Sequence, residues 1–247
     1  NCVGVIKQRS EAKAAIPSIK INALLPHRLA EVCNEWGGRL IHFSTDCVFS
    51  GKRGLYTEDD ISDAEDLYGK SKYLGEVATE NAITLRTSII GRELSHHKSL
   101  LDWFLSQNHS QVRGFKRALY SGVTTNHLAE VVRDLIEHHP HLSGLYQVVG
   151  NTISKYDLLH LVRDAWDLDI EISPDENFVC DRSMIGDKLH QATGYVAPAW
   201  PQLVAQLAAD TTPYQEWRTE DAIINRQTST YYGRNRVFGQ SISPAAA

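Results

Sequence analysis

The order of apolar and turn-forming segments predicts an α/β protein with a doubly wound parallel sheet. Runs typical of strands alternate with runs typical of helices, and polar residues follow directly after an expected strand at Ser44. The chain has 247 residues, of which 42% are hydrophobic and 22% charged. This alternation is typical of parallel sheets covered by helices, and the length suffices for one or two domains with a sizeable core.

The N-terminal part of the chain begins with an expected strand and an expected helix. Residues 1–6 form an apolar run that predicts a short strand, and residues 18–36 carry apolar side chains at helical spacing. Pro26 lies inside the helical run and predicts a kink or a split there. Gly37 and Gly38 follow and end the helix.

A second expected strand leads into polar residues. Residues 39–43 predict the strand, and Ser44, Thr45 and Asp46 follow it directly. Ligands of open α/β sheets bind at the carboxyl ends of strands, so this position is a candidate site. Residues 50–67 are polar and acidic and predict a surface loop.

The alternation continues through the rest of the chain. A helix is expected from Tyr68, and the β-rich run over 82–90 predicts a buried strand that Gly91 ends. Ser154 is an expected helix N-cap, with Asp157 three residues later. The remaining expected elements are helices over 98–107 and 126–138, strands over 118–123 and 145–149, and a poorly ordered polar tail.

Composition excludes several classes of protein. A formal net charge of −5 gives no long-range attraction to phosphate backbones, so nucleic acid is not expected as a partner. The four cysteines are scattered without a CxxC pair, which favours reduced thiols and no metal site. No apolar run approaches the roughly 18 residues of a membrane span and no secretory leader is present. We therefore expect a cytoplasmic protein that does not enter a membrane.

The segment Tyr68-Gly69-Lys70-Ser71-Lys72 is the most informative local pattern. Residues four apart share one face of a helix, so the Tyr68 hydroxyl and the Lys72 ammonium are expected to point into one site. A nearby ammonium is expected to lower the pKa of Tyr68 from its usual value near 10. Such a hydroxyl exchanges protons with an alcohol or a carbonyl. By itself, the pair also fits a surface tyrosine beside a solvated lysine.

Thr45 and Asn22 are further candidate functional residues because of their positions in the expected elements. Thr45 lies at the end of an expected strand, where its hydroxyl would hydrogen-bond a substrate carbonyl oxygen, although a polar strand-to-loop transition explains it equally well. Asn22 is a poor helix former inside an expected helix, which suggests a role other than helix formation. Many helices nevertheless tolerate one asparagine.

Taken in order, these motifs resemble the extended short-chain dehydrogenase/reductases, and most closely the dTDP-4-dehydrorhamnose reductase family. The resemblance runs from Asn1 to about Asp210. The segments that carry it are Asn1 to Gly4, Ile21 to Ala23, Phe43 to Phe49, Tyr56 to Asp60, Tyr68 to Lys72, Leu85 to Ser88, Gly144 to Tyr146, Asp181 to Ser183, Lys188-Leu189 and Thr193-Gly194. A match of this extent, in order, is more specific than any one motif.

The resemblance implies a catalytic set. In that family a nicotinamide cofactor, NADP or NAD, delivers hydride to a keto group on a nucleotide-linked deoxysugar, for the synthesis of cell-surface polysaccharide precursors. Tyr68 would be the proton donor, and Lys72 would lower its pKa and hold the nicotinamide ribose. Thr45 would hydrogen-bond the carbonyl, and Asn22 would support Lys72.

The resemblance also implies cofactor and substrate contacts. Beside Tyr68 and Lys72, the residues that would line the cofactor are Cys2, Val3, Gly4, Ser44, Thr87 and Ser88. Thr45, Asp46, Ile89 and Arg182 would contact a nucleotide-sugar substrate, Arg182 because a guanidinium suits a pyrophosphate. A homodimer is compatible with the resemblance, and the sequence leaves the oligomeric state open.

This sequence departs from the family pattern in two places. It contains no GxGxxG or GxxGxxG fingerprint, and it starts at Asn1 in an apolar run. The match therefore implies an N-terminally truncated chain that begins at the fourth strand of the family's sheet and lacks the pyrophosphate-binding helix N-terminus. Ile89 and Ile90 also follow Ser88 where rhamnose-type reductases are expected to carry an aromatic residue, so the sugar stays open.

Two other functions remain alternatives. One is a non-catalytic, reductase-like nucleotide-binding or regulatory subunit, and the other is a nucleotide-sugar epimerase of the same superfamily. A dehydratase is not favoured, because Asp46 is followed by Cys47 rather than by a second acidic residue. The expected division by role is a truncated cofactor-binding core with the catalytic residues over 1–92, a mixed core and substrate-binding region over 93–212, and a tail over 213–247.

Overall fold

The computed structural model describes residues 1–7, 13–94 and 99–218. Two compact units divide the chain: residues 1–92 with 98–210, and residues 93–97 with 211–247. All helices and strands named below belong to the first unit. The expected division by role into 1–92, 93–212 and 213–247 stays a prediction, and most of the expected tail lies outside the described residues.

A three-stranded parallel sheet forms the centre of the first half of this unit. Its strands are β1 (Leu40–Thr45), β2 (Ala82–Thr87) and β7 (Gly144–Gln147), and β2 lies in the middle. The register aligns Thr45 with Thr87 and Arg86 with Gln147. All six residues of β2 are buried, as expected for a central parallel strand.

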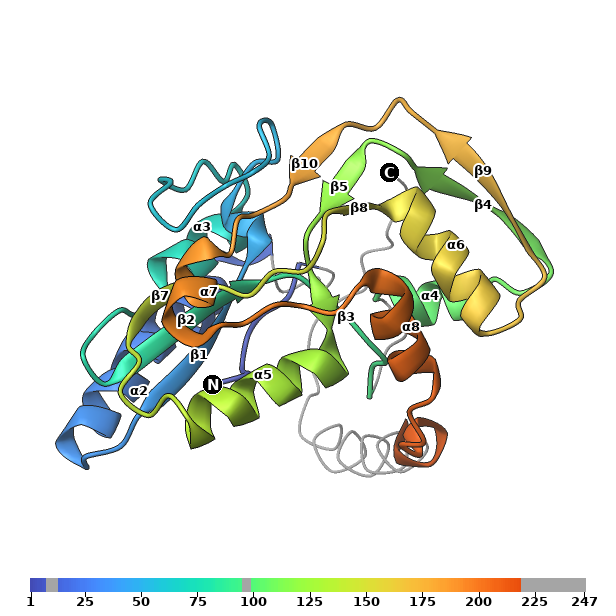
Figure 1. Cartoon of the computed structure of the whole chain (residues 1–247). Coiled ribbons are helices and arrows are strands. Elements are labelled where there is room, and N and C mark those ends of the chain that lie inside the picture. The colour runs from blue at the N-terminus through green and yellow to red at the C-terminus, as the bar shows by residue number, and fades with distance from the viewer. Residues whose placement is uncertain (8–12, 95–98, 219–247) are drawn as a thin grey trace, which may run out of the picture. The chain divides into compact units, whose positions relative to one another are not determined.

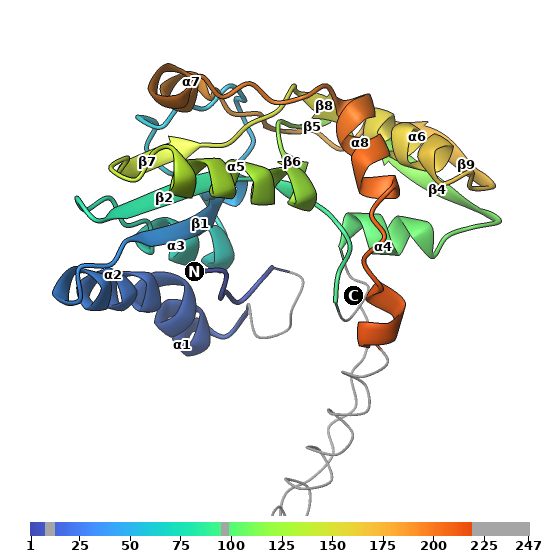
Figure 2. The same cartoon turned by 60° about the horizontal axis from the view of Figure 1, so that its bottom comes forward.

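Helices cover both faces of this sheet (Figure 2). On one face lie α2 (Leu25–Glu35) and α3 (Leu67–Leu74), where Ala30, Leu40 and Ala82 share a small apolar cluster. On the other face lie α5 (Thr125–Glu137) and α7 (Asp187–Thr193), whose Leu135 and Leu189 pack with residues of β2 and β7. The predicted doubly wound α/β fold is confirmed.

The expected first helix is split into three segments. A short α1 (Ala15–Ser18) is followed by a π-helical segment, η2 (Ile19–Leu24), and then by α2. Pro26 lies in the first turn of α2, where a missing backbone N–H costs little. The interruption expected at Pro26 thus takes the form of a change in helix type just ahead of the proline.

The second half of the unit contains smaller sheets and a second core. Its strands are β3 (Ile89–Ile90), β4 (Ser110–Phe115), β5 (Ala118–Tyr120), β6 (Val123–Thr124), β8 (Ile153–Ser154), β9 (Ile170–Asp175) and β10 (Cys180–Arg182). They pair as β10-β5-β8, β3-β6 and β4-β9. The helices are α4 (Leu100–Leu105), α6 (Lys155–Ala165) and α8 (Trp200–Ala208). Their apolar side chains form the largest buried cluster, which includes Phe104, Leu158 and Leu203.

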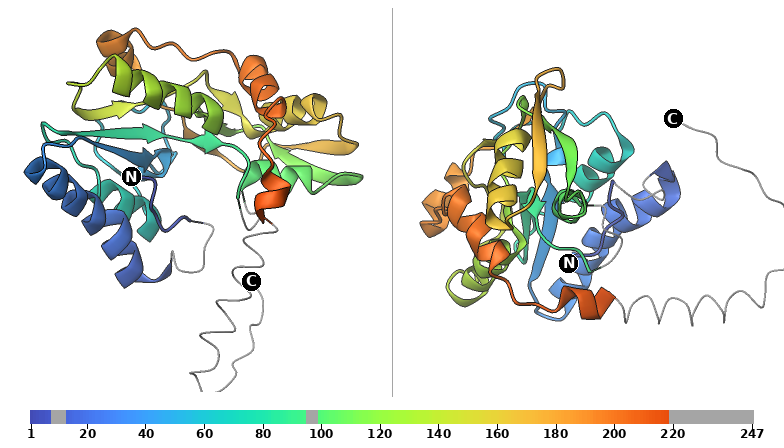
Figure 3. Two further views of the ribbon diagram at one scale, coloured as in Figure 1. Left: turned by 90° about the horizontal axis from the view of Figure 1, so that it is seen from below. Right: turned by 90° about the vertical axis from the view of Figure 1, so that its right-hand side faces the viewer.

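Figures 1 and 3 place the β4-β9 pair at the end of this unit away from the blue strand β1. Neither β4 nor β9 was expected from the sequence. The expected N-terminal strand is wrong, because residues 1–6 have no regular secondary structure and Val3 is 57% exposed. An apolar run forms a strand only where a partner strand and a buried face exist.

Candidate functional site

The carboxyl end of β1 carries three buried polar residues, Ser44, Thr45 and Asp46. Thr45 is the N-cap of the 3-10 helix η3 (Asp46–Val48), and its Oγ1 accepts a hydrogen bond from the Cys47 N–H at 3.1 Å. The same hydroxyl donates to Asp46 Oδ1 at 3.1 Å. To bind a substrate oxygen, the Thr45 hydroxyl would therefore turn its proton away from Asp46.

Helix α3 lies directly against η3. Asp66 caps the helix by accepting from the Gly69 N–H at 2.8 Å. A Cβ at position 69 would come within 2.2 Å of the Cys47 carbonyl oxygen, so only glycine permits this approach. The approach brings the Tyr68 side chain close to Thr45, whose hydroxyl acts to lower the pKa of the Tyr68 phenol. Two of the predicted catalytic residues thus meet at the end of β1.

Lys72 reaches the same strand from one helical turn further along α3. Its ammonium is buried and donates to the Phe43 carbonyl oxygen at 2.6 Å. Burial lowers the pKa of Lys72 to about 8, against the opposing effect of the Glu76 carboxylate. Part of the charge on this ammonium is therefore lost just above neutral pH.

The expected effect of Lys72 on Tyr68 is wrong in this structure. Burial raises the pKa of the Tyr68 hydroxyl well above its usual value, and the nearby Cys47 and Asp46 side chains act in the same direction. Of the larger effects on the pKa of Tyr68, only that of the neighbouring Thr45 hydroxyl lowers it. The phenol is consequently protonated at neutral pH, which is the form that a proton donor needs.

Asn22 lies in the π-helical segment and is 1% exposed. Its side-chain oxygen accepts from the Val5 N–H at 2.8 Å, and its Nδ2 donates to the Val5 carbonyl at 2.9 Å. Nδ2 also lies 3.2 Å from the Oγ of Ser71, which in turn donates to the Tyr68 carbonyl at 3.0 Å. Asn22 thus joins residues 1–7 to the helix that carries Tyr68 and Lys72, without contacting Lys72 in this structure.

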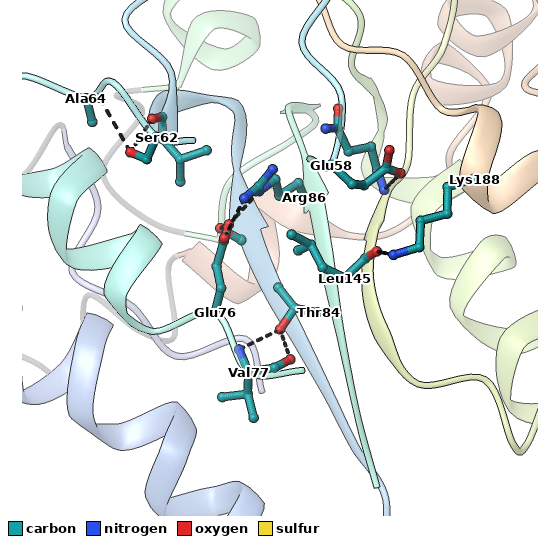
Figure 4. A network of polar contacts seen from close by, with 12 residues as sticks. Glu58, Ser62, Ala64, Glu76, Val77, Thr84, Arg86, Leu145 and Lys188 are labelled. Atoms are coloured by element: carbon teal, nitrogen blue, oxygen red, sulfur yellow. Dashed lines mark hydrogen bonds and ion pairs between the residues drawn. The ribbon is translucent and has the colours of Figure 1, made fainter. Parts of the chain in front are cut away.

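A buried ion pair lies beneath the site (Figure 4). Arg86 Nε and Nη2 each donate to one oxygen of the Glu76 carboxylate at 2.7 Å, and the Arg86 side chain is 2% exposed. Ser44 Oγ donates to Glu76 Oε1 at 2.6 Å. Glu76 therefore connects the ends of β1 and β2, and it was not expected from the sequence, although it lies only four residues after Lys72 and just beyond the end of α3. The Ser44 hydroxyl, which was expected to line the cofactor, thus donates its proton to Glu76 in this structure.

The other expected cofactor residues lie near the same strand ends. Thr87 stands beside Thr45 in the sheet register, and its Oγ1 donates to the Ser88 carbonyl at 3.3 Å. A Cβ on Gly4 would lie 3.4 Å from Asn22 Oδ1, which places Gly4 beside that helix. Cys2 and Val3 are exposed. The structure thus brings Gly4 and Thr87 close to the site, and it gives Cys2 and Val3 no buried contact.

Of the expected substrate residues, Arg182 lines a hollow, whereas Thr45, Asp46 and Ile89 are not among the residues that line it. A cavity of about 300 Å³ is lined by Cys47, Phe49, Ser50, Ala64, Glu65, Asp66 and Arg182. Arg182 Nε donates to the Phe49 carbonyl at 2.8 Å. Burial beside Asp46 raises the pKa of the Cys47 thiol to about 12, so this cysteine is an unreactive thiol. Ile89 is 54% exposed on the short strand β3.

Within residues 1–7, 13–94 and 99–218, no group of three or more His, Cys, Asp or Glu side chains is arranged to hold a metal ion. None of the helices described there combines the length and apolar character needed to cross a bilayer.

A parallel sheet with helices on both faces, and with polar residues gathered at the strand ends, defines a Rossmann-like α/β fold. Comparison with family models identifies it more closely. The chain belongs to the family described as the RmlD substrate binding domain, whose model matches residues 8–212.

Curated relatives fall into two functional groups. The spore coat polysaccharide biosynthesis protein SpsK of Bacillus subtilis is 33% identical over 143 residues, which cover 55% of this chain and 49% of SpsK. The methionine adenosyltransferase 2 subunit beta of Rattus norvegicus is 29% identical over 170 residues, which cover 60% of this chain and 48% of that subunit. The chain thus spans about half the length of the curated relatives that it matches.

A solved structure shares the fold. The dTDP-4-dehydrorhamnose reductase of Bacillus anthracis, crystallised with NADP, superposes with a TM-score of 0.72 at 19% identity. The superposition covers 83% of this chain and 78% of the reductase.

Proposed function

We propose that the protein containing this chain reduces a keto group on a nucleotide-linked deoxysugar with NADPH or NADH. The observation that carries the proposal is the convergence of the Thr45 hydroxyl, the Tyr68 hydroxyl and the Lys72 ammonium at the carboxyl end of β1. Membership of the RmlD substrate binding domain family and the likeness to a reductase fold support it.

Tyr68 is the proton donor in this proposal. Its raised pKa keeps the phenol protonated, so it would give its proton to the carbonyl oxygen as negative charge develops there. Thr45 and Tyr68 lie close enough for the Thr45 hydroxyl to affect the pKa of Tyr68, so a carbonyl oxygen placed between them would accept from both hydroxyls. The negative charge that develops on this oxygen would then be stabilised by two donors, one at the end of β1 and one on α3.

Lys72 suits a nicotinamide ribose. Among the described residues its ammonium donates one hydrogen bond, to the Phe43 carbonyl, which leaves two protons for the ribose hydroxyls. The bound cofactor, NADP or NAD, supplies the hydride. Asn22 would hold α3 in place, and the side chains and backbone that would line the cofactor are Cys2, Val3, Gly4, Ser44, Thr87 and Ser88.

The substrate side of the site is proposed to include Thr45, Asp46, Ile89 and Arg182. Arg182 lines the cavity beside Cys47 and would bind the pyrophosphate of a nucleotide sugar. The similarity to SpsK supports a place in polysaccharide precursor synthesis, which for a nucleotide sugar is a cytoplasmic step. A homodimer stays a prediction that sedimentation would test.

Replacement of Tyr68 by Phe tests this function. We expect Tyr68→Phe to lower turnover of a 4-keto nucleotide sugar by about 10²- to 10⁴-fold, because the proton donor is removed while the ring stays. The measurement is the loss of NADPH absorbance. Tyr73→Phe, on the exposed side of the same helix, is the matched control and should keep full activity. Full activity of Tyr68→Phe would exclude the proposed mechanism.

A second candidate is a non-catalytic, nucleotide-binding regulatory subunit. The similarity to the subunit beta of methionine adenosyltransferase 2 favours it. The two candidates differ in one measurement: a regulatory subunit would bind its nucleotide without any turnover, and Tyr68→Phe would then leave its effect on a partner enzyme unchanged.

A further inference from the structure

Two buried side chains at the strand ends, Arg86 and Gln147, carry polar atoms without a hydrogen-bond partner. Both residues are buried, Gln147 with 0% of its surface exposed. In the part of the chain that the structure describes, the atoms without a partner are Nη1 of Arg86 and both Nε2 and Oε1 of Gln147. Buried polar atoms in proteins are nearly always hydrogen-bonded, to other protein groups or to ordered water, because leaving them unpaired costs free energy.

The two side chains lie on the same face of the central sheet. Arg86 of β2 is opposite Gln147 of β7 in the parallel register. Opposite residues of a parallel pair point to the same face, and neighbouring strands are about 4.7–4.9 Å apart. The unpartnered guanidinium nitrogen and the unpartnered amide therefore belong to adjacent side chains at the carboxyl ends of these strands.

The packing around Phe49 agrees with this placement. The Cζ atom of Arg86 lies 5.1 Å from the centre of the Phe49 ring. Val149, two residues after Gln147, packs against the buried cluster that contains Phe49. Glu58, labelled in Figure 4, accepts from the backbone N–H of Gln147 at 2.9 Å, so this contact leaves the Gln147 side chain unpaired. The Phe49 side chain has no hydrogen-bonding atom, and it therefore excludes solvent without satisfying Arg86 Nη1.

The charge of Arg86 is already balanced. Its Nε and Nη2 atoms each donate to the Glu76 carboxylate at 2.7 Å. The missing partner of Nη1 is therefore a neutral acceptor rather than a second anion. The Gln147 amide offers both an acceptor and a donor. A small neutral molecule that accepts and donates hydrogen bonds fits both side chains, and water has these properties.

We propose that Arg86 and Gln147 bind an internal water molecule at the carboxyl ends of β2 and β7. The water accepts a hydrogen bond from Arg86 Nη1 and donates one to Gln147 Oε1. Water bridges polar groups that are too far apart for a direct hydrogen bond, and a buried water typically makes about three hydrogen bonds. Gln147 Nε2 donates to the same water or to a second one beside it.

The water extends the polar network beneath the candidate site to a third strand. Ser44 of β1 donates to Glu76, and Glu76 pairs with Arg86 of β2. The water connects Arg86 to Gln147 of β7, so side-chain contacts join the carboxyl ends of all three strands of the central sheet. The water site does not depend on the proposed reductase activity, and a regulatory subunit with this fold would have it as well.

Oxygen-17 relaxation of the solvent tests the proposal on the full chain, because it counts the water molecules that a protein holds in its interior. We expect Gln147→Met, which keeps the side-chain length but removes the amide, to lower this count by at least one. A buried water needs two or more polar partners, and Arg86 Nη1 alone does not suffice. Gln111→Met is the matched control. Gln111 is exposed and bonds the surface side chains of Glu171 and Ser173, so its loss should leave the count unchanged.

A measurement on the wild type applies if thermal unfolding shows that Gln147→Met is not folded. In nitrogen-15-edited NMR spectra, the Nε2 protons of Gln147 should receive magnetisation by cross-relaxation from a water molecule held beside them. The proposal is overturned by an unchanged count of internal waters in folded Gln147→Met, or by the absence of cross-relaxation from water at the Gln147 amide. A crystal structure with a direct hydrogen bond between Arg86 Nη1 and Gln147 Oε1 would overturn it as well.

Discussion

The position of the Lys72 side chain is predictable from the sequence, but its contacts are not. The sequence predicts that Lys72 lies on the same helix face as Tyr68, because residues four apart share a face. Its contact with the Phe43 carbonyl is not predictable, since it depends on how α3 packs on β1. The same is true of the raised pKa of Tyr68, which follows from burial rather than from the sequence neighbours.

Stability should depend on pH through Lys72. The pKa of Lys72 is about 8 in the folded chain and its ordinary value is 10.5, so between these two pH values the unfolded chain binds more protons and the stability of the wild type rises with pH. We expect the stability advantage of Lys72→Met over wild type to shrink by about 3 kcal/mol across this range. Urea unfolding at several pH values measures it.

Lys70→Met, exposed on the same helix, is the control for loss of a lysine. A difference between wild type and Lys72→Met that stays constant from pH 8 to pH 10.5 would contradict the prediction.

At the scale of elements, β1, β2 and α3 are joined by one buried carboxylate. The strands over 39–43 and 82–90 and the helix from Tyr68 were predicted, and the structure has them as β1, β2 with β3, and α3. The pairing of Glu76 with Arg86 was not predicted, because it requires knowledge that β1 and β2 are neighbours. Long-range pairs of this kind are set by topology rather than by local pattern.

Removing one side chain of the Glu76–Arg86 ion pair should lower the stability of the fold. Glu76→Gln leaves the Arg86 guanidinium buried and unpaired, so we expect a loss of about 3–5 kcal/mol in the free energy of unfolding. The double variant Glu76→Gln, Arg86→Met should lose less than the sum of the two single variants, as urea unfolding would measure. Arg28→Ala breaks an exposed pair on α2 and should have no measurable effect. Additive losses in the double variant would mean that the two side chains are not coupled.

At the scale of the whole chain, two apolar clusters belong to one compact unit. Leu203 lies in the cluster of α4, α6 and α8, and Ile83 and Leu85 lie in the cluster of β2, α5 and α7. Of the elements in the second cluster, β2 and α5 were expected from the alternation of strands and helices, and α7 was not. The first depends on β4, β9 and α8, which the sequence analysis did not place, although Ile170 and Ile172 alternate as in a half-buried strand.

Because both clusters lie in one unit, damage to one should weaken the other. We expect Leu203→Ala to lower the free energy of unfolding by about 2–5 kcal/mol through the cavity that it leaves. Hydrogen exchange at the backbone amides of Ile83 and Leu85 should then become faster. Ile136→Ala, at a side chain 58% exposed, is the control and should change exchange little. Unchanged exchange in β2 of the Leu203→Ala chain would mean that the clusters unfold independently.

The parallel pair of β4 and β9 has a consequence for synthesis on the ribosome. Ser110 pairs with Ile170, so β4 emerges sixty residues before its partner. At 5–20 residues per second, the edge of β4 waits roughly 3–12 s with its backbone groups unpaired. During that interval a nascent chain exposes a strand edge to other chains. The order of translation therefore leaves the edge of β4 open to aggregation in newly made protein until β9 has been synthesised.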